Sequence, residues 1–151
     1  LGLVGSDMCI RYRVGGAPFG KQRPRHNRYT NTTYTPKETT NHEALVAMIY
    51  RMQYGQTKFE PGVPLKITVR AYMSIPKGAT KAKRKLMLEG TIRPTVKPDW
   101  DNIGKLVADA LNGVAYDDDK CICAAIVEKF YSDAPRTEIE VTECVVNPGN
   151  T

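Results

Sequence analysis

The residues best suited to chemistry lie between Lys97 and Asp119. Asp99 and Asp101 stand two residues apart, and Lys105 follows four residues after Asp101. An acidic run, Asp117-Asp118-Asp119, comes after the segment that separates them. Magnesium prefers oxygen ligands, and it is usually held by one or two carboxylates while it keeps water and phosphate oxygens as its other ligands. The pattern therefore predicts a metal-carboxylate site with a lysine beside it.

Each part of this pattern also has a purely structural interpretation. An aspartate before a helix is often only its N-cap. An aspartate and a lysine four residues apart often form a solvent-exposed ion pair of little energetic value. An acidic run after Asn112-Gly113 is often a polar turn. What favours the functional interpretation is that several acids and a lysine converge in a chain that is otherwise basic.

The elements that must position these residues follow from hydrophobic periodicity. An extended backbone from Asp99 to Asp101 would aim both carboxylates to one side, because strand side chains alternate. A helix is predicted to begin with Asp101 as its N-cap and to end at Asn112-Gly113. One apolar stripe supports this helix: Ile103, Leu106, Val107, Ala110 and Leu111. Lys105 could then lean over the helix start, and the turn after Gly113 would return the acidic run to the same end.

The remaining periodicity predicts an α+β domain with a small mixed β-sheet packed with helices. Strands are expected over residues 8–14 and 63–75, and a terminal hairpin over residues 121–131 and 136–146. A helix is expected over residues 36–54, with a capping box at residues 35–38 and an apolar stripe. That stripe comprises Leu45, Met48, Ile49 and Met52. A short basic helix lies within residues 77–90, and residues 15–28 are expected to form an irregular loop rich in glycine and proline.

Charge is distributed unevenly along the chain. The net charge is +6, but residues 1–97 hold 18 Lys and Arg against 5 Asp and Glu, whereas residues 98–151 hold 4 against 11. A basic surface of this kind suits a polyanion such as DNA. A protein that only bound DNA would lose affinity by placing acids near phosphates, whereas one that cuts DNA needs acids to hold a cation. The asymmetry therefore favours a nuclease.

Two basic segments are the candidates for contact with phosphates, although either is equally compatible with a solvated surface. One is the loop at residues 15–28, and the other is the short helix near residue 83. Tyr29 and Tyr34 beside the loop are candidates for stacking on bases or for ordinary packing. The predicted nucleic-acid-binding residues are Lys21, Arg23, Arg25, Arg28, Lys81, Lys83, Arg84, Lys85 and Lys97.

Length and composition set further bounds. A chain of 151 residues fits one domain, taken as residues 8–146. Residues 1–7, which precede the first methionine, are expected to be disordered or foreign to the natural chain, and residues 147–151 to form a tail. No apolar run is long enough to span a membrane and no signal peptide is recognisable. The four cysteines lack zinc-site spacing and are expected to be reduced, as in a cytoplasmic protein.

Taken together, six motifs resemble the RusA-type Holliday junction resolvases, small endodeoxyribonucleases often found in phages and prophages. The motifs are Lys21-Gln-Arg-Pro-Arg25, Tyr34-Thr-Pro, Lys97-Pro-Asp-x-Asp-Asn with Lys105, Asp109-Ala-Leu-Asn-Gly, Tyr116-x-Asp-Asp and Glu128-Lys-x-Tyr131. Each motif is weak alone, but the set is specific, and the resemblance spans roughly residues 8–146. Trp100 departs from the family pattern, which usually has a smaller aliphatic residue at this position.

The resemblance implies a homodimer that binds four-way DNA junctions and makes paired symmetric nicks with Mg²⁺, for which Mn²⁺ substitutes. It implies Asp99, Asp101 and Asp118 as the metal-site carboxylates and Lys105 as the essential lysine. Because the acidic run has three members, Asp119 remains an alternative to Asp118. Asp109 is interpreted as part of a structural network, and a supporting role behind the metal ligands is the alternative.

Two other functions remain compatible with the sequence. The first is a non-catalytic accessory protein that binds branched DNA. The second is a magnesium-dependent nucleotide hydrolase, although the chain lacks a P-loop and such an enzyme would leave the basic surface unused.

Overall fold

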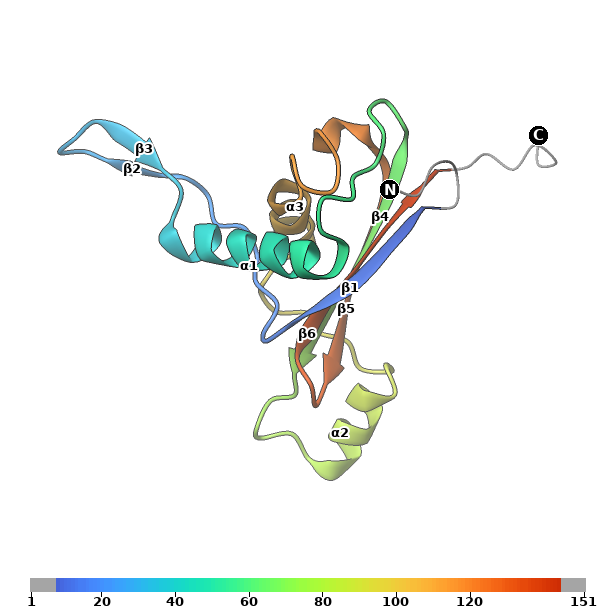
Figure 1. The fold of residues 1–151 in the computed structure, drawn as a ribbon. Coiled ribbons are helices and arrows are strands. Elements are labelled where there is room, and N and C mark those ends of the chain that lie inside the picture. Colours follow the sequence, from blue (N-terminus) through green and yellow to red (C-terminus); the bar gives the residue numbers. More distant parts are fainter. Residues whose placement is uncertain (1–7, 145–151) are drawn as a thin grey trace.

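A four-stranded mixed β-sheet organises the fold in the computed structural model, which describes residues 8–144. Its strands are β1 (Cys9–Gly15), β4 (Leu65–Ser74), β5 (Ile122–Ser132) and β6 (Arg136–Glu143), in the spatial order β1-β6-β4-β5 (Figure 1). Strand β4 pairs parallel with β5 and antiparallel with β6. The α+β class and the small mixed sheet predicted from the sequence are confirmed.

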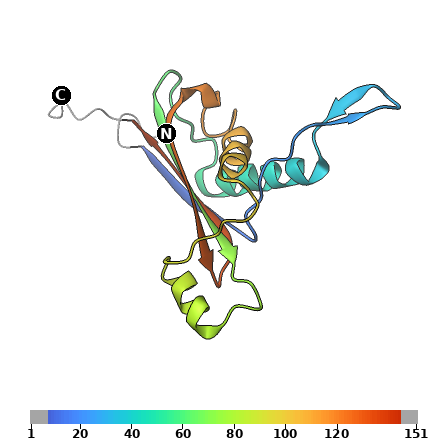
Figure 2. The same ribbon diagram turned by 180° about the vertical axis from the view of Figure 1, so that it is seen from behind.

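Helices α1 (Lys37–Tyr54) and α3 (Trp100–Ala110) lie together against one face of this sheet, as Figures 1 and 2 show. The short helix α2 (Lys81–Leu88) lies at the opposite end of the sheet from the one-turn helix η1 (Asp119–Cys121), which leads into β5. A separate two-stranded hairpin, β2 (Arg25–Asn27) and β3 (Thr32–Tyr34), projects from the body. Within residues 8–144, no helix combines the length and apolarity needed to cross a bilayer.

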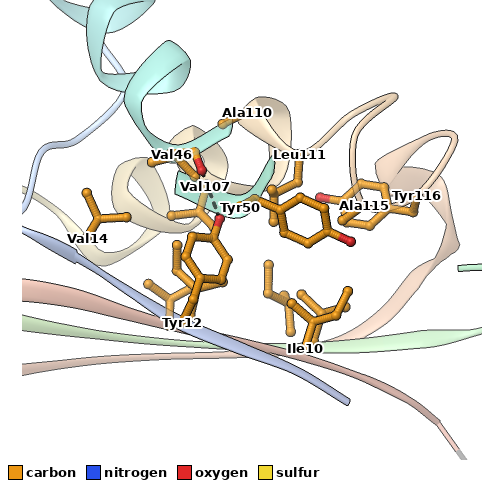
Figure 3. Packing of buried hydrophobic residues seen from close by; sticks show 14 of the residues in the cluster. Ile10, Tyr12, Val14, Val46, Tyr50, Val107, Ala110, Leu111, Ala115 and Tyr116 are labelled. Carbon is orange, nitrogen blue, oxygen red and sulfur yellow. Dashed lines mark hydrogen bonds between the residues drawn. The ribbon is translucent and has the colours of Figure 1, made fainter. Parts of the chain in front are cut away.

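The hydrophobic core fills the space between the sheet and the two larger helices (Figure 3). Alternate residues of β1 and β4 point into it, and α1 contributes Val46 and Tyr50. The Tyr12 hydroxyl donates a hydrogen bond to the Val46 carbonyl at 3.1 Å, so this buried polar group is satisfied. Burying an aliphatic or aromatic side chain fully contributes about 1.5–3 kcal/mol. The core thus fixes α1 and α3 on the sheet.

The predicted terminal hairpin of β5 with β6 is wrong, because β4 lies between these two strands. The central position suits β4, whose residues Leu65, Ile67, Val69 and Ala71 are almost completely buried. A strand with such a face gains ladder hydrogen bonds on both sides, whereas β5 is more exposed and takes the edge.

Helix α1 ends before Gly55 as predicted, but two details differ. The expected capping box does not form, because the N-cap is Pro36 and no side chain caps the helix. Of the predicted stripe, Leu45 and Ile49 pack against the core, whereas Met48 and Met52 are exposed. The fully buried residues of this face are Thr39, Val46, Ala47 and Tyr50. The Tyr50 ring packs edge-on against Tyr12 with centroids 5.8 Å apart, so this aromatic residue decides which face of the helix is buried.

The structure also contains a hairpin where an irregular loop was expected. Strands β2 and β3 are three residues each and are almost wholly exposed. Their sequences lack the alternation of apolar and polar residues that predicts a strand. Residues 1–7 and 147–151, for which disorder and a tail were predicted, lie outside the described residues.

Helix α3 begins at Trp100, and its predicted stripe is buried in full. Gly104 lies where this helix comes closest to β5: a Cβ atom added there would be 3.0 Å from Val127 Cγ2. Glycine in a helix costs about 1 kcal/mol relative to alanine. The close approach of α3 to β5 explains why a glycine occupies this position in the helix despite that cost.

We therefore expect Gly104→Val to lower the free energy of unfolding by about 1–3 kcal/mol, because the added methyl groups must displace Val127. Chemical denaturation with tryptophan fluorescence measures this. The matched control is Gly78→Val, since nothing lies within 4 Å of a Cβ at Gly78. Equal stability of the two variants would contradict the close approach.

Candidate active site

The start of α3 carries two of the predicted acids. Asp99 is the N-cap residue, with an extended backbone and no side-chain capping bond, and Asp101 lies in the first turn. The prediction that Asp101 is the N-cap, with Asp99 and Asp101 on one side of an extended segment, is therefore wrong. The helix starts two residues earlier because Trp100 already has helical geometry. Both carboxylates are exposed near the positive end of the helix dipole, which favours negative charge there.

A hollow between α3 and β5 brings three predicted residues together. Asp101, Lys105 and Asp119 line it, over an apolar floor that includes Val127. Trp100, 64% exposed, also lines this hollow. The close approach at Gly104 places helix and strand side by side at this point. One acid from α3, one acid from the run before β5 and one ammonium group therefore share a single surface depression.

The two alternatives for the third carboxylate have different surroundings. The Asp118 carboxylate accepts a hydrogen bond from the Lys120 amide at 2.9 Å, and this bond lowers the pKa of Asp118. Asp118 thus acts as the N-cap of η1. The Asp119 amide donates to Asn112 Oδ1 at 2.9 Å, which fixes the backbone. Its side chain lines the hollow.

The electrostatic surroundings of Asp119 are unfavourable to its charge. Partial burial raises the pKa of Asp119, and the nearby carboxylates of Asp109 and Asp118 raise it further. Acids crowded in this way repel one another unless a cation lies between them. A raised pKa of this origin, in a surface hollow, is a common feature of functional sites.

Asp99 lies outside this hollow, in depressions that adjoin it. It lines one depression with Trp100, Asp101 and Lys129, and another with Lys97 and Arg23. Asp101 is therefore the acid that these depressions share: it lines one depression with Asp99 and the hollow with Asp119. Asp99 lies closest to the basic loop that precedes β2.

Lys21 joins the basic loop to α1 and α3 through ion pairs with Glu43 and Asp109. The Lys21 ammonium is 2.6 Å from Asp109 Oδ2 and 3.4 Å from Glu43 Oε1, and only about a fifth of each of these side chains is exposed. Burial alone would lower the pKa of Lys21, but the hydrogen bond to Asp109 and the charges of Asp109 and Glu43 outweigh this and raise it. Lys21, predicted to bind DNA, is thus engaged within the protein and positions the loop on α3. This supports the structural interpretation of Asp109.

Lys105 also leans toward Asp109 rather than toward the helix start. Its Nζ atom is 3.8 Å from Asp109 Oδ2, four residues further along the helix. The expected pair was with Asp101, four residues before Lys105. The Lys105 side chain is 63% exposed, so this pair contributes little and leaves the ammonium free to turn into the hollow.

The other predicted DNA-binding residues fall into two groups at different ends of the molecule (Figures 1 and 2). Arg23, Arg25, Arg28 and Lys97 are exposed in or near the hairpin. On α2, Lys81 and Lys83 are exposed, whereas Arg84 pairs with Asp133 and Lys85 is 4.0 Å from Glu89. The basic surface is therefore divided between the two ends.

Sequence reasoning missed two residues of the site. Trp100 borders both acid-lined depressions, and its position between two aspartates was a usable signal. Lys129 lines the depression of Asp99 and Asp101, and its ammonium donates to the Val96 carbonyl. Lys129 belongs to the motif Glu128-Lys-x-Tyr131, but the motif gave it no role in the site.

The donor set suits a hard cation. Among residues 8–144, no group of three or more His, Cys, Asp and Glu side chains is arranged so that it could hold a metal ion. Magnesium does not need three protein ligands, since one or two carboxylates suffice when water and phosphate supply the rest. Asp101 and Asp119 share a hollow and carry only oxygen ligands, so the residues present fit this mode of binding.

Comparison with known proteins places the molecule in a class of endodeoxyribonucleases. Residues 15–142 match the family described as Endodeoxyribonuclease RusA, and the chain belongs to this family. The resemblance predicted from the motifs is thereby confirmed. A relative from Bacillus subtilis (strain 168), described as "Uncharacterized protein YqaN", is 33% identical over 139 residues. That match covers 89% of this chain and 96% of the relative.

The crowded acids generate a prediction about stability. Because the folded-state pKa of Asp119 is raised, its contribution to stability falls as the pH rises through that pKa, and ionised Asp119 disfavours the fold at pH 7. Asp119→Asn should therefore raise the thermal midpoint in EDTA by about 1–2 °C. The exposed control is Asp117→Asn. This variant removes an ion pair with Lys58 and should not raise the thermal midpoint. A lower midpoint for Asp119→Asn than for wild type would refute the repulsion.

Proposed function

We propose that the protein is a metal-dependent endonuclease that resolves four-way DNA junctions by paired symmetric nicks. The observation that carries this proposal is the shared hollow of Asp101, Lys105 and Asp119, in a member of the Endodeoxyribonuclease RusA family. The net charge of +6 supports DNA as the substrate. The resemblance to resolvases that phages and prophages carry supports a prophage origin and action on cytoplasmic DNA.

Asp101 and Asp119 would hold Mg²⁺, or Mn²⁺ in its place, with Asp99 contributing from the side of the basic loop. We propose Asp119 for the third position in place of Asp118, because Asp118 is occupied as the cap of η1. A bound divalent ion supplies an activated water and neutralises charge on the phosphate. Asp119 is repelled by the neighbouring carboxylates of Asp109 and Asp118, and a bound cation would relieve this repulsion.

Lys105 acts on the scissile phosphate. Its exposed ammonium lies at the edge of the hollow, and its only ion pair among the described residues is a long contact with Asp109. Phosphate binding would replace this weak contact by a stronger charge-assisted one. The ammonium then stabilises the negative charge that develops on the phosphate during in-line displacement.

The divided basic surface suits a branched substrate. The residues near the hairpin and those on α2 would contact the phosphates of different duplex arms, with the acids between the two groups. Lys21 contributes indirectly by fixing the loop. Phosphate contacts release counterions, so binding should weaken steeply with salt.

Two symmetric nicks need two active sites, so we propose a homodimer. The sheet face opposite α1 and α3 supports this, since it carries charges of both signs. Arg11 lies 3.4 Å from Glu140, and Arg70 lies 4.0 Å from both Glu128 and Glu140. A surface with both signs is suited to pairing with a copy of itself.

The site assignment predicts how single variants behave on a labelled four-way junction. Asp101→Asn and Asp119→Asn should bind the junction in EDTA as wild type does, but nick it at least about 100-fold more slowly in Mg²⁺. Lys105→Met should slow nicking by about 100-fold or more. Single-turnover rates on gels measure the nicks, and fluorescence anisotropy measures binding.

Asp118→Asn is the matched control for Asp119→Asn. An asparagine still accepts the Lys120 amide bond, so this variant should nick within a few-fold of the wild-type rate. Wild-type nicking by Asp101→Asn would overturn the site. Tight junction binding without product in any divalent metal would favour a non-catalytic accessory protein, and cleavage of nucleotides alone would favour a nucleotide hydrolase.

A further inference from the structure

The hairpin of β2 and β3 presents a fully exposed aromatic side chain. Tyr29 lies in the turn between the two strands, and 100% of its surface is accessible. The hairpin projects away from the sheet and its helices in both views (Figures 1 and 2). A two-stranded hairpin has no core of its own, so the tyrosine ring contributes nothing to packing there.

The turn that carries Tyr29 is nevertheless ordered by its own hydrogen bonds. Asn27 Oδ1 accepts from the Tyr29 amide at 2.9 Å and from the Thr30 amide at 3.4 Å. The Thr30 and Thr32 hydroxyls lie 2.7 Å apart, and Asn31 takes the left-handed conformation with φ of 52°. These bonds order the backbone of the tip, and the Tyr29 side chain on it is fully exposed.

The base of the hairpin is anchored beside the candidate acids. The Lys21 amide donates to the Asn102 carbonyl at 2.8 Å, and the Gln22 amide donates to Thr39 Oγ1 at 3.1 Å. Gly20 packs so closely that an added Cβ would lie 2.9 Å from Pro98 Cβ. The loop therefore connects the hairpin rigidly to the residues that precede Asp99.

We propose that Tyr29 stacks on an unpaired or unstacked base at the branch point of the DNA, and that it contributes to the preference for branched over linear duplex. This rests on the proposed function. Arg25 and Arg28 flank the tyrosine and would hold the neighbouring phosphates. Aromatic side chains bind bases of any type through their faces, so this contact reads structure rather than sequence. In a fully paired duplex no base face is open to the ring.

The test compares Tyr29→Ala, Tyr29→Phe and the control Tyr34→Ala, in EDTA, on a four-way junction and a linear duplex. Tyr29→Ala should weaken junction binding about 10-fold and leave duplex binding unchanged. Tyr29→Phe should keep both affinities, because its ring still stacks. A 2-aminopurine base at the branch point should be quenched by wild type and Tyr34→Ala but not by Tyr29→Ala.

Wild-type junction affinity and quenching in Tyr29→Ala would overturn the proposal. Equal losses on junction and duplex would also overturn it, since they would indicate a general effect on the hairpin. A wild-type protein that prefers the junction but never nicks it would refute the proposed function while leaving the tyrosine contact testable by the same measurements.

A second, independent observation concerns two thiols at the other edge of the structure. Cys123 Sγ lies 3.0 Å from Cys144 Sγ, and both cysteines are free. Cys123 belongs to β5 and Cys144 follows β6, so the two thiols meet across the start of β4. The Cys144 amide is bonded to the Pro64 carbonyl at 2.8 Å, which fixes its position.

We infer that Cys123 and Cys144 form a modification site that a small-molecule disulfide, such as glutathione disulfide, oxidises. The thiolate of the more exposed Cys123 attacks one sulfur of the oxidant and releases one thiolate. The Cys144 thiolate then attacks Cys123 Sγ in this mixed disulfide. The disulfide between Cys123 and Cys144 forms, and the second glutathione leaves as a thiolate that carries the electron pair of the broken S–S bond. This bond would tie β5 to β6 four residues beyond Asp119.

Intact mass after incubation with glutathione disulfide tests this. In a Cys9→Ser, Cys121→Ser background, which removes the other two free thiols, the protein should lose about 2 Da without a glutathione adduct, and reductant should reverse the loss. Adding Cys123→Ser or Cys144→Ser to this background should instead leave a glutathione adduct on the remaining thiol. Stable glutathione adducts on both Cys123 and Cys144 of the background protein, or no reaction, would refute the site.

Discussion

The candidate site depends on how closely α3 approaches β5. Gly104 allows this approach, and the buried stripe of α3 holds the helix in that position. The outer face of the same helix then presents Asp101 and Lys105 toward the acidic run that leads into β5. A bulkier residue at this point would separate the two elements. The geometry of the site is therefore a consequence of core packing rather than of any contact among the acids themselves.

Electrostatics within the site work in two directions. Asp109 is balanced by Lys21 at 2.6 Å and serves to fix the basic loop, whereas Asp119 lies among like charges that raise its pKa. The first arrangement stabilises the fold, and the second costs stability in the absence of a cation. Sites that bind metals often keep such unfavourable arrangements, because bound ligand offsets them.

The sequence predicted much of this arrangement. The stripe of α3 and the alternation of β4 were strong periodic signals, and both elements are where they were expected. The motif set also indicated the correct family. These signals succeed because burial imposes a regular spacing on apolar residues, and because a site with many required groups leaves several motifs in one chain.

What the sequence did not predict depends on tertiary packing. No local signal shows that β4 lies between β5 and β6. The order of strands in a sheet depends on how well each strand is buried when it is paired on both sides. The exposed hairpin has no apolar pattern. The engagement of Lys21 by Asp109 joins residues 88 positions apart, and a basic loop gives no hint of it. The different hydrogen bonding of Asp118 and Asp119 in η1 is likewise not visible in the sequence.

We propose that Asp101 and Asp119 together hold a divalent ion beside Lys105. The anomalous scattering of Mn²⁺ in crystals of the protein tests this. We expect a single strong peak, or a close pair, within coordination distance of carboxylate oxygens from both Asp101 and Asp119. A peak bound by Asp118 alone, or none at millimolar Mn²⁺ with the acids ordered, would contradict it.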